Sequence, residues 1–368
     1  MDDPLLFVAA GEPSGDNAAS RLISELRLFE PDLKLFGLGG GRLQKQGQDQ
    51  LADSGHLAVL GFWEVAKRFR FFRQLLKKCE KEIERRRPNC ILLVDYPGFN
   101  LRLARRVKRL GIPIVYYISP QIWAWGGNRV KEIAQLVDLM LLILPFEQRF
   151  YSNTSVKYEF VGHYLLEDIA DEQVASEIPT DGHLCLMPGS RKQEIERMLP
   201  VMLQAAARFN SEFGVKAVVA AVSGVFDYDR VVEPFRQHDV TVEYDNSRSL
   251  IYESSLVLTA SGTATLECAV IGRPMVVVYK TGWITYQIAK RLVQLDSIAL
   301  VNLVLAEGVV PELIQADASP ENMFEKLREL WQDESLYRRI KRKLDGVADN
   351  LGGKGASRRA AEEVARFL

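Results

Sequence analysis

The sequence has little of what secreted and metal-binding proteins require. Its 368 residues include only four cysteines and four histidines. The cysteines form no closely spaced pair, and most adjoin apolar runs, so we expect buried, reduced thiols of a cytosolic protein and no disulfide framework. They are Cys79, Cys90, Cys185 and Cys268. No cluster of metal-ligating residue types is visible either, so the sequence predicts no metal site.

Long apolar runs are also missing. None approaches the roughly 20 residues that span a bilayer. The opening Met1-Asp2-Asp3-Pro4 is acidic and lacks the basic segment of a signal peptide. We therefore expect a cytoplasmic protein whose membrane contact is peripheral. The net charge is -1, and no nucleic-acid partner is expected.

What is present suits a globular protein of two domains. Hydrophobic residues make up 47% of the chain and charged residues 26%, which excludes a disordered chain. A chain of 368 residues is too long for one ordinary core. The pattern pauses at Gly162-His163, so we place a first domain at 1–165 and a second at 166–340. A helical tail at 341–368 would pack on the first domain or on a partner subunit.

Short apolar runs alternate with helix-spaced segments in both halves, which predicts two α/β domains with parallel, doubly wound sheets. The expected strands are Leu5–Ala10, Leu33–Leu38, Cys90–Val94, Ile114–Ile118, Leu139–Leu144, a run from Leu184, Lys216–Ala221, Val240–Tyr244, Leu256–Ala260 and Met275–Tyr279. In such sheets ligands bind beyond the carboxyl ends of the strands. The polar loops at Gly11–Asp16, Asp95–Asn100 and Ser119–Trp125 are therefore expected to line one cleft.

Two strand-to-helix turns in the second half are suited to a diphosphate. Helix N-termini expose unpaired N–H groups, glycine allows close approach, and arginine is a bidentate anion clamp. The first turn offers Gly189, Ser190 as a cap and Arg191. The second offers Ser261, Gly262 and Thr263, with Glu267 as a candidate for a ribose hydroxyl. Ordinary capped turns, with Glu267 a simple first-turn acid, are the alternative.

Asp95 is the candidate general base. It directly follows an apolar strand, where a charged side chain has no packing reason to be, and Pro97 would fix the shape of the loop. A role as helix cap is the alternative, and Glu12 is the second candidate base. His163 is interpreted as a hydrogen-bonded hinge residue rather than a base.

The segment from Phe62 to Lys78 combines aromatic residues at helical spacing with six cations. An interfacial helix needs both, because apolar burial and attraction to anionic lipid act together. We expect an anionic membrane surface to meet Phe62, Phe69, Phe71, Phe72, Arg70 and Arg73. A basic core helix is the alternative.

Several motifs, in order, resemble the lipid-A-disaccharide synthase family. They are Gly11-Glu12-Pro13-Ser14-Gly15-Asp16, Asp95-Tyr96-Pro97-Gly98-Phe99-Asn100, Ser119-Pro120-Gln121-Ile122-Trp123-Ala124-Trp125, Leu144-Pro145-Phe146-Glu147, Pro188-Gly189-Ser190-Arg191 and Ser261-Gly262-Thr263-Ala264-Thr265-Leu266-Glu267. Gly98, Leu43 and Tyr164 depart from the family pattern. Gly98 stands where some members carry an acid, which argues against a mechanism needing a carboxylate pair in that loop.

The resemblance implies a GT-B glycosyltransferase, two Rossmann-like domains facing a cleft. It implies inverting transfer of 2,3-diacylglucosamine from UDP to 2,3-diacylglucosamine 1-phosphate, forming a β-1,6-linked disaccharide without a metal or other cofactor. Acceptor contacts would come from Ser14, Asn100, Trp123 and Trp125. The expected location is the cytoplasmic face of the inner membrane. The sequence does not decide between a monomer and a homodimer.

Two other functions fit the residues alone. One is another nucleotide-sugar enzyme of this architecture, such as a UDP-N-acetylglucosamine epimerase or a transferase with a different acceptor. The other is a non-catalytic nucleotide-sugar-binding module. Such a module would keep the Arg191 loop but would not need Glu12 and Asp95 in the other half, so the two carboxylates favour catalysis.

Overall fold

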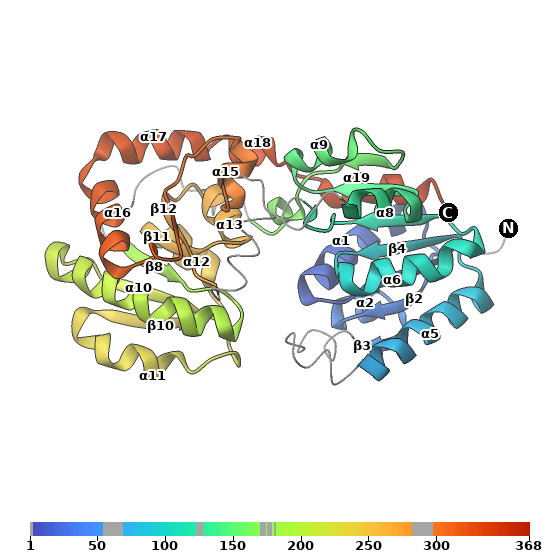
Figure 1. Cartoon of the computed structure of the whole chain (residues 1–368), viewed down its shortest axis with the longest axis horizontal. Coiled ribbons are helices and arrows are strands. Elements are labelled where there is room, and N and C mark those ends of the chain that lie inside the picture. Colours follow the sequence, from blue (N-terminus) through green and yellow to red (C-terminus); the bar gives the residue numbers. More distant parts are fainter. Residues whose placement is uncertain are drawn as a thin grey trace. The chain divides into compact units, whose positions relative to one another are not determined.

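A computed structural model describes residues 3–53, 69–122, 128–169, 174, 179, 182–281 and 297–368. The chain forms two compact α/β units (Figure 1). Unit 1 comprises Met1–Tyr164 and Gly352–Leu368, and unit 2 comprises Leu165–Leu351. Each unit is built on its own parallel sheet.

The sheet of unit 1 has seven parallel strands in the order β3-β2-β1-β4-β5-β6-β7. Its central strands β4 and β5 are buried along their whole length, and β1 is buried from Leu6 on, as expected for a sheet covered on both faces. The strands are β1 (Leu5–Ala10), β2 (Lys34–Gly39), β3 (Asp49–Asp53), β4 (Cys90–Val94), β5 (Ile114–Tyr117), β6 (Leu139–Leu142) and β7 (Lys157–Phe160).

Helices cover this sheet according to the alternation of its side chains. Phe7 and Ala9 of β1 belong to one apolar cluster with Cys79 and Ile83 of α5 and Leu103 of α6. Two helices distant in sequence, α1 and α19, pack against each other. The helices of unit 1 are α1 (Pro13–Phe29), α2 (Gly41–Lys45), α5 (Phe69–Arg86), α6 (Pro97–Val107), α8 (Asn128–Leu136), α9 (Gln148–Tyr151) and α19 (Ala356–Ala365), with 3-10 turns η1 (Lys108–Leu110) and η2 (Pro145–Glu147).

The sheet of unit 2 has six parallel strands in the order β10-β9-β8-β11-β12-β13. The strands are β8 (His183–Met187), β9 (Ala217–Ala221), β10 (Val240–Tyr244), β11 (Ser254–Ala260), β12 (Met275–Tyr279) and β13 (Glu312–Ile314). The helices are α10 (Lys192–Phe213), α11 (Tyr228–Val232), α12 (Ser247–Glu253), α13 (Ala264–Ile271), α15 (Leu300–Leu305), α16 (Pro320–Gln332), α17 (Glu334–Leu344) and α18 (Val347–Asn350), with 3-10 turns η3 (Tyr164–Glu167) at its start and η5 (Glu233–His238). None of the described helices is long and apolar enough to cross a bilayer.

The expected doubly wound parallel sheets are confirmed, and the expected strands appear within two residues of their predicted bounds. Three edge strands were not predicted: β3, β7 and β13. β3 reads Asp-Gln-Leu-Ala-Asp, and β7 alternates exposed and half-buried positions, so neither shows a continuous apolar run. The tail expected from residue 341 begins at Gly352 instead, because α17 continues through 341 within unit 2.

Each sheet has one point where the chain reverses the direction in which it adds strands. In unit 1 this switch point lies between β1 and β4, where Ala10 pairs with Val94. In unit 2 it lies between β8 and β11, where Met187 pairs with Thr259. The loops leaving two such strands diverge and open a crevice, which is where ligands bind in sheets of this kind. The predicted catalytic loops follow β1 and β4, and the predicted phosphate loops follow β8 and β11.

Candidate active site

The switch point of unit 1 brings Glu12 and Asp95 onto neighbouring loops. Glu12 is the N-cap residue of α1, and Asp95 follows β4 directly. The ring of Tyr96 lies against Gly11, because a Cβ added at Gly11 would collide with it. Burial, and next the charge of Glu12, raises the pKa of Tyr96. The two loops are therefore packed together, and both candidate carboxylates are half-buried.

The Asp95 loop has an unusual backbone that its neighbours hold in place. Asp95 and Tyr96 both have a φ of 47°, a left-handed conformation that non-glycine residues adopt at a cost of about 1–3 kcal/mol each. The Asp95 carbonyl accepts hydrogen bonds from the Asn100 amide at 2.7 Å and the Tyr116 hydroxyl at 2.6 Å. α6 begins at Pro97 with Tyr96 as its N-cap residue, so Asp95 does not occupy the capping position.

Asn100, which was predicted to contact the acceptor, lies inside unit 1. Its side chain is fully buried, and its amide nitrogen also lies 3.2 Å from the Ala9 carbonyl and 3.1 Å from that of Val94. The amide therefore ties the ends of β1 and β4 to the Asp95 loop. Ser14 is exposed in the first turn of α1. Trp123 and Trp125 lie outside the described residues.

Glu147 is a buried carboxyl that residue-by-residue reasoning did not assign. It ends the turn η2 after β6, is 2% exposed, and accepts a hydrogen bond from the Leu144 amide at 3.1 Å. Burial, reinforced by the charge of Asp95, raises the pKa of Glu147 to about 8. The signal was available, since Glu147, like Asp95, is an acid placed just after an apolar strand.

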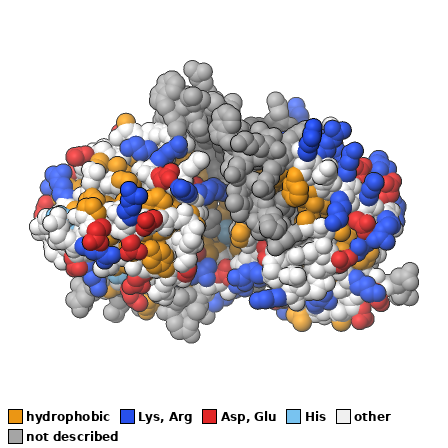
Figure 2. Space-filling model, turned by 90° about the horizontal axis from the view of Figure 1, so that it is seen from below, with side chains coloured by type: hydrophobic (Ala, Val, Ile, Leu, Met, Phe, Trp, Pro, Cys, Tyr) orange, Lys and Arg blue, Asp and Glu red, His pale blue; other side chains and the backbone are white. Residues whose placement is uncertain are grey.

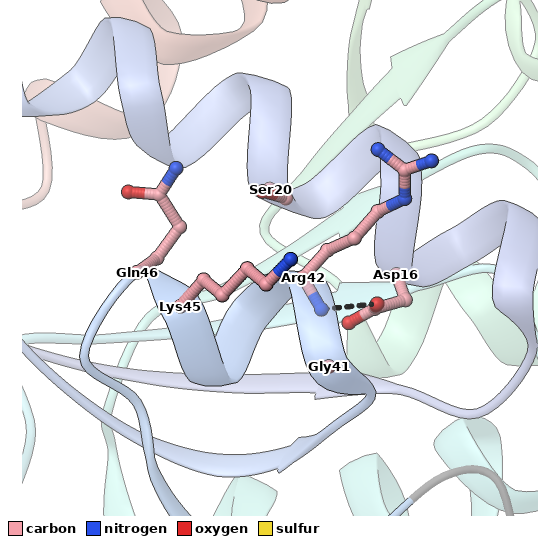
Figure 3. A pocket seen from close by; sticks show the side chains of 6 residues that line it. All are labelled: Asp16, Ser20, Gly41, Arg42, Lys45 and Gln46. Atoms are coloured by element: carbon pink, nitrogen blue, oxygen red, sulfur yellow. Dashed lines mark hydrogen bonds between the residues drawn. The ribbon is translucent and has the colours of Figure 1, made fainter.

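A pocket of about 500 Å³ lies in unit 1 between α1 and α2 (Figure 3). It is lined by Asp16, Ser20, Gly41, Arg42, Lys45 and Gln46. The buried Asp16 carboxylate accepts three backbone N–H groups around the start of α2, from Gly40, Arg42 and Leu43 at 2.7–3.2 Å. In Figure 3 the Lys45 side chain extends toward Arg42, opposite Ser20. No carboxylate among the described residues forms an ion pair with Arg42 or Lys45, so the pocket suits an anion.

In unit 2 the turn after β8 keeps the features expected of a phosphate loop. Gly189 has a φ of 110°, and a Cβ there would lie 2.7 Å from the Glu194 carboxylate, so only glycine fits. The N-cap residue of α10 is Arg191, not Ser190 as expected, and Ser190 is exposed one residue earlier. The Arg191 side chain is 74% exposed and meets Glu194 only at 3.4 Å, which leaves it available to an anion.

The turn after β11 is only partly available for a ligand. The Ser261 hydroxyl donates to the Ile298 carbonyl at 2.9 Å, so this side chain supports the loop. Gly262, with a φ of 155°, has open space around it, and Thr263 is exposed. Glu267 is paired through Oε1 with Arg248 at 3.2 Å, while burial raises its pKa. Arg248 also donates to the Asp168 carbonyl at 2.7 Å, which holds the arginine beside Glu267.

The basic helix α5 divides the aromatic residues that were predicted to meet a membrane. Phe72 is half-buried, with its ring centroid 6.5 Å from that of Phe99, so it belongs to the core side. Phe71 is 39% exposed and lies between the exposed Arg70 and Arg73. Phe62 and the Phe69 side chain lie outside the described residues. Figure 2 shows the side on which α5 lies in Figure 1, with Lys and Arg side chains crowded over unit 1 at the right.

His163 lies inside the fold, as a structural histidine would. His163 is buried, and burial lowers its pKa to about 4, so its ring is neutral near pH 7. In the part of the chain that the structure describes, no three His, Cys, Asp or Glu side chains gather as a metal site would require.

Known proteins resemble the chain in both sequence and fold. A sequence model of the family described as Lipid-A-disaccharide synthetase matches residues 6–366. The lipid-A-disaccharide synthase of Anaeromyxobacter sp. (strain K) is 41% identical over 374 residues, which cover 99% of this chain and 97% of that protein.

Two solved structures share the fold at low sequence identity. A UDP-GlcNAc 2-epimerase from Neisseria meningitidis bound to UDP-GlcNAc superposes with a TM-score of 0.63 at 13% identity, covering 95% of this chain and 97% of that one. The glycotransferase of kitacinnamycin superposes with a TM-score of 0.64 at 16% identity, covering 99% of this chain and 98% of that one. The likeness shows the two-domain GT-B type of fold.

Proposed function

Because the chain belongs to the lipid-A-disaccharide synthase family and is thus a glycosyltransferase, we propose that it transfers 2,3-diacylglucosamine from UDP-2,3-diacylglucosamine to 2,3-diacylglucosamine 1-phosphate. The products would be UDP and the β-1,6-linked disaccharide 1-phosphate. The observation that supports this best is the convergence of Glu12 and Asp95 at one switch point. The alternative of an epimerase is supported only by a likeness of fold at 13% identity. A non-catalytic binding module would not need two carboxylates at the switch point of unit 1.

The proposed chemistry is a single displacement with inversion. The 6-hydroxyl oxygen of the acceptor attacks C1 of the donor sugar, the bond from C1 to the UDP oxygen breaks, and the hydroxyl proton passes to the Asp95 carboxylate. A positioned carboxylate suits this task, because the hydroxyl becomes acidic only as it attacks. The backbone N–H groups of the loop after β8 and the Arg191 side chain would hold the diphosphate of the leaving UDP. No step in this scheme requires a metal.

Substitution of Arg191 tests the donor site. A charged hydrogen bond to phosphate contributes roughly 1.5–3 kcal/mol, so Arg191→Ala should weaken UDP binding about ten- to a hundredfold in calorimetry. Lys192→Ala is the matched control, since Lys192 is the next residue, is also exposed, and lies 3.9 Å from Glu196. Unchanged UDP affinity in the Arg191 variant would remove this loop from the donor site.

Substitution of Asp95 tests both the reaction and its base. The wild type, given both substrates with EDTA present, should release UDP and disaccharide, measured by mass spectrometry. Asn adopts left-handed backbone readily, so Asp95→Asn keeps the loop while removing the base. Its kcat should fall by about 10²–10⁴ with UDP affinity intact. If Asp95→Asn turns over normally and Glu12→Gln does not, Glu12 is the base instead.

We also propose that the pocket beside α2 holds the 1-phosphate of the acceptor. Arg42 and Lys45 supply two cations, and the Asp16 charge is already shared by three N–H groups. The pocket lies beyond the carboxyl end of β2. Glu12 follows the carboxyl end of the neighbouring parallel strand β1, so both lie at the same edge of the sheet. A phosphate is the part of the acceptor that such a polar, cationic pocket can recognise.

The double variant Arg42→Gln/Lys45→Gln should raise the acceptor KM at least about tenfold while leaving the donor KM unchanged, because the lost charged hydrogen bonds are made to the acceptor alone. Steady-state assays with each substrate varied in turn measure this. With an acceptor that lacks the phosphate, variant and wild type should be equally slow. Lys34→Gln, an exposed cation of the same unit paired with Asp3, is the control. An unchanged acceptor KM would contradict the assignment.

The acyl chains of both substrates suggest a membrane source, and we propose that the exposed side of α5 meets an anionic bilayer surface from the cytoplasm. Phe71, Arg70 and Arg73 would make this contact, with Phe72 excluded by its packing on Phe99. An exposed aromatic between cations can insert while the charges bind lipid headgroups.

The variant Arg70→Gln/Phe71→Ser/Arg73→Gln should bind anionic liposomes at least about thirtyfold more weakly in flotation, since each cation near the surface contributes about 1 kcal/mol. Wild-type binding should fall as salt rises. Lys81→Gln, an exposed cation farther along α5, controls for net charge. A triple variant that is folded by circular dichroism and floats like the wild type would assign α5 to a structural role only.

A further inference from the structure

The turn after β11 (residues 261–263), one of the two proposed donor loops, is anchored to another segment of unit 2. The Ser261 hydroxyl donates to the Ile298 carbonyl at 2.9 Å, and Ile298 lies in segment 297–299, which leads into α15. α15 packs against α13, the helix that begins just after the turn. The position of Ser261 therefore depends on what holds segment 297–299 in place.

Glu312, the first residue of the edge strand β13, holds this segment through both oxygens of its side chain. Oε2 accepts a hydrogen bond from the Ile298 N–H at 2.9 Å, and Oε1 accepts one from the Ala299 N–H at 3.2 Å. Oε1 also accepts hydrogen bonds from the Ser297 hydroxyl and, at 2.7 Å, from the Asn302 amide. Donors from one short stretch of chain thus converge on a single carboxylate.

The backbone that carries Glu312 is itself held from two directions. β13 pairs with β12, where Glu312 lies opposite Val277. On the other side, the buried Asn302 accepts hydrogen bonds from the N–H groups of Val309 at 2.9 Å and Val310 at 3.0 Å. Its amide also donates to the Val310 carbonyl at 3.0 Å. The first turn of α15 is therefore joined to the chain that enters β13, and the carboxylate cannot move independently of either.

We propose that Glu312 is a positioning residue for the donor site. By holding segment 297–299, it places the Ile298 carbonyl where the Ser261 hydroxyl binds it, and it thereby sets the shape of the turn after β11. Glu312 acts without touching the donor, since protein groups already occupy both of its oxygens. A turn that is formed in advance binds a diphosphate more tightly, because binding then does not have to order it. This inference rests on the proposed binding of UDP at that turn.

A carboxylate suits this position because all of these partners are donors and a carboxylate only accepts. A glutamine offers one oxygen and one NH₂ group. If its oxygen keeps the donors on the Oε1 side, its NH₂ group faces the Ile298 N–H, and two donors meet. Glu312→Gln therefore keeps the size of the side chain and disturbs the residue whose carbonyl holds Ser261.

Hydrogen exchange in the protein without ligand tests the hold of Glu312 on the turn. The amides of Ser261, Thr265 and Leu266 make backbone hydrogen bonds in and beside the turn. Glu312→Gln should raise their exchange rates at least about threefold, measured by mass spectrometry, because a turn that is no longer anchored opens more often.

Tyr337→Phe is the matched control. It removes a buried hydroxyl that donates to the Ser255 carbonyl at 2.8 Å, near the amino end of β11, whereas the turn follows the carboxyl end of the same strand. This variant should lower the Tm without speeding exchange at the turn. Exchange that is no faster in Glu312→Gln than in Tyr337→Phe would overturn the proposal.

Calorimetry with UDP tests the consequence for binding. Glu312→Gln should weaken UDP binding about five- to twentyfold, whereas Tyr337→Phe should not. Ser261→Ala should cause a similar loss, and the double variant Glu312→Gln/Ser261→Ala should bind no more weakly than the weaker single variant, because both changes break one chain of contacts. The acceptor KM should stay unchanged. Losses that simply add would contradict the proposed route through Ile298.

The two measurements separate this proposal from the donor site on which it rests. If Ser261→Ala weakens UDP binding and Glu312→Gln does not, the turn keeps its place in the donor site and the role of Glu312 fails. If Glu312→Gln speeds exchange at the turn while neither variant changes UDP affinity, the turn is not part of the donor site. The role of Glu312 in donor binding then fails with it, and only its hold on the turn stands.

Discussion

The amide of Asn100 is the constraint on which the shape of the Asp95 loop depends. It reaches the carbonyls of Ala9 and Val94, near the ends of the neighbouring strands β1 and β4, and the carbonyl of Asp95, the first residue of the loop after β4. Two successive left-handed residues can persist only if their surroundings over-determine them. The bonds from Asn100 and Tyr116 do this from the buried side. The backbone that carries the Asp95 side chain is thereby held by two buried side chains.

The two units place different side chains at the same point of the same topology. Both sheets open at a switch point, but unit 1 places carboxylates there and unit 2 places a glycine turn, a helix start and an exposed arginine. Carboxylates would repel a diphosphate and an arginine would not accept a proton, which is consistent with assigning the proposed proton transfer and diphosphate binding to different units. Unit 2 does carry one acid near its switch point, Glu267, and its charge is balanced by Arg248, which is itself hydrogen-bonded to the Asp168 carbonyl.

Sequence patterns predicted the central strands and the loops after them because those features are local. A strand buried on both faces is an apolar run, and the acid or glycine that ends it is visible in the letters. The patterns failed where neighbours decide. The sequence does not show that the Asn100 amide lies beside three carbonyls of its own unit. Phe71 and Phe72 are adjacent and identical in type, yet one faces solvent and one Phe99, a difference set by packing against α6. The edge strand β3 has too few apolar residues to be detected.

Unit 1 is completed by residues that lie far along the chain. Gly352 packs against Gly162, Arg359 donates to the Val161 carbonyl at 2.8 Å, and α19 lies on α1. Unit 2 is a single continuous segment inserted between these two parts. During synthesis on the ribosome, unit 2 can therefore close its core as soon as residue 351 has emerged. Unit 1, though begun first, must hold the face of α1 uncovered until residues 352–368 arrive, so the order of completion runs opposite to the order of translation.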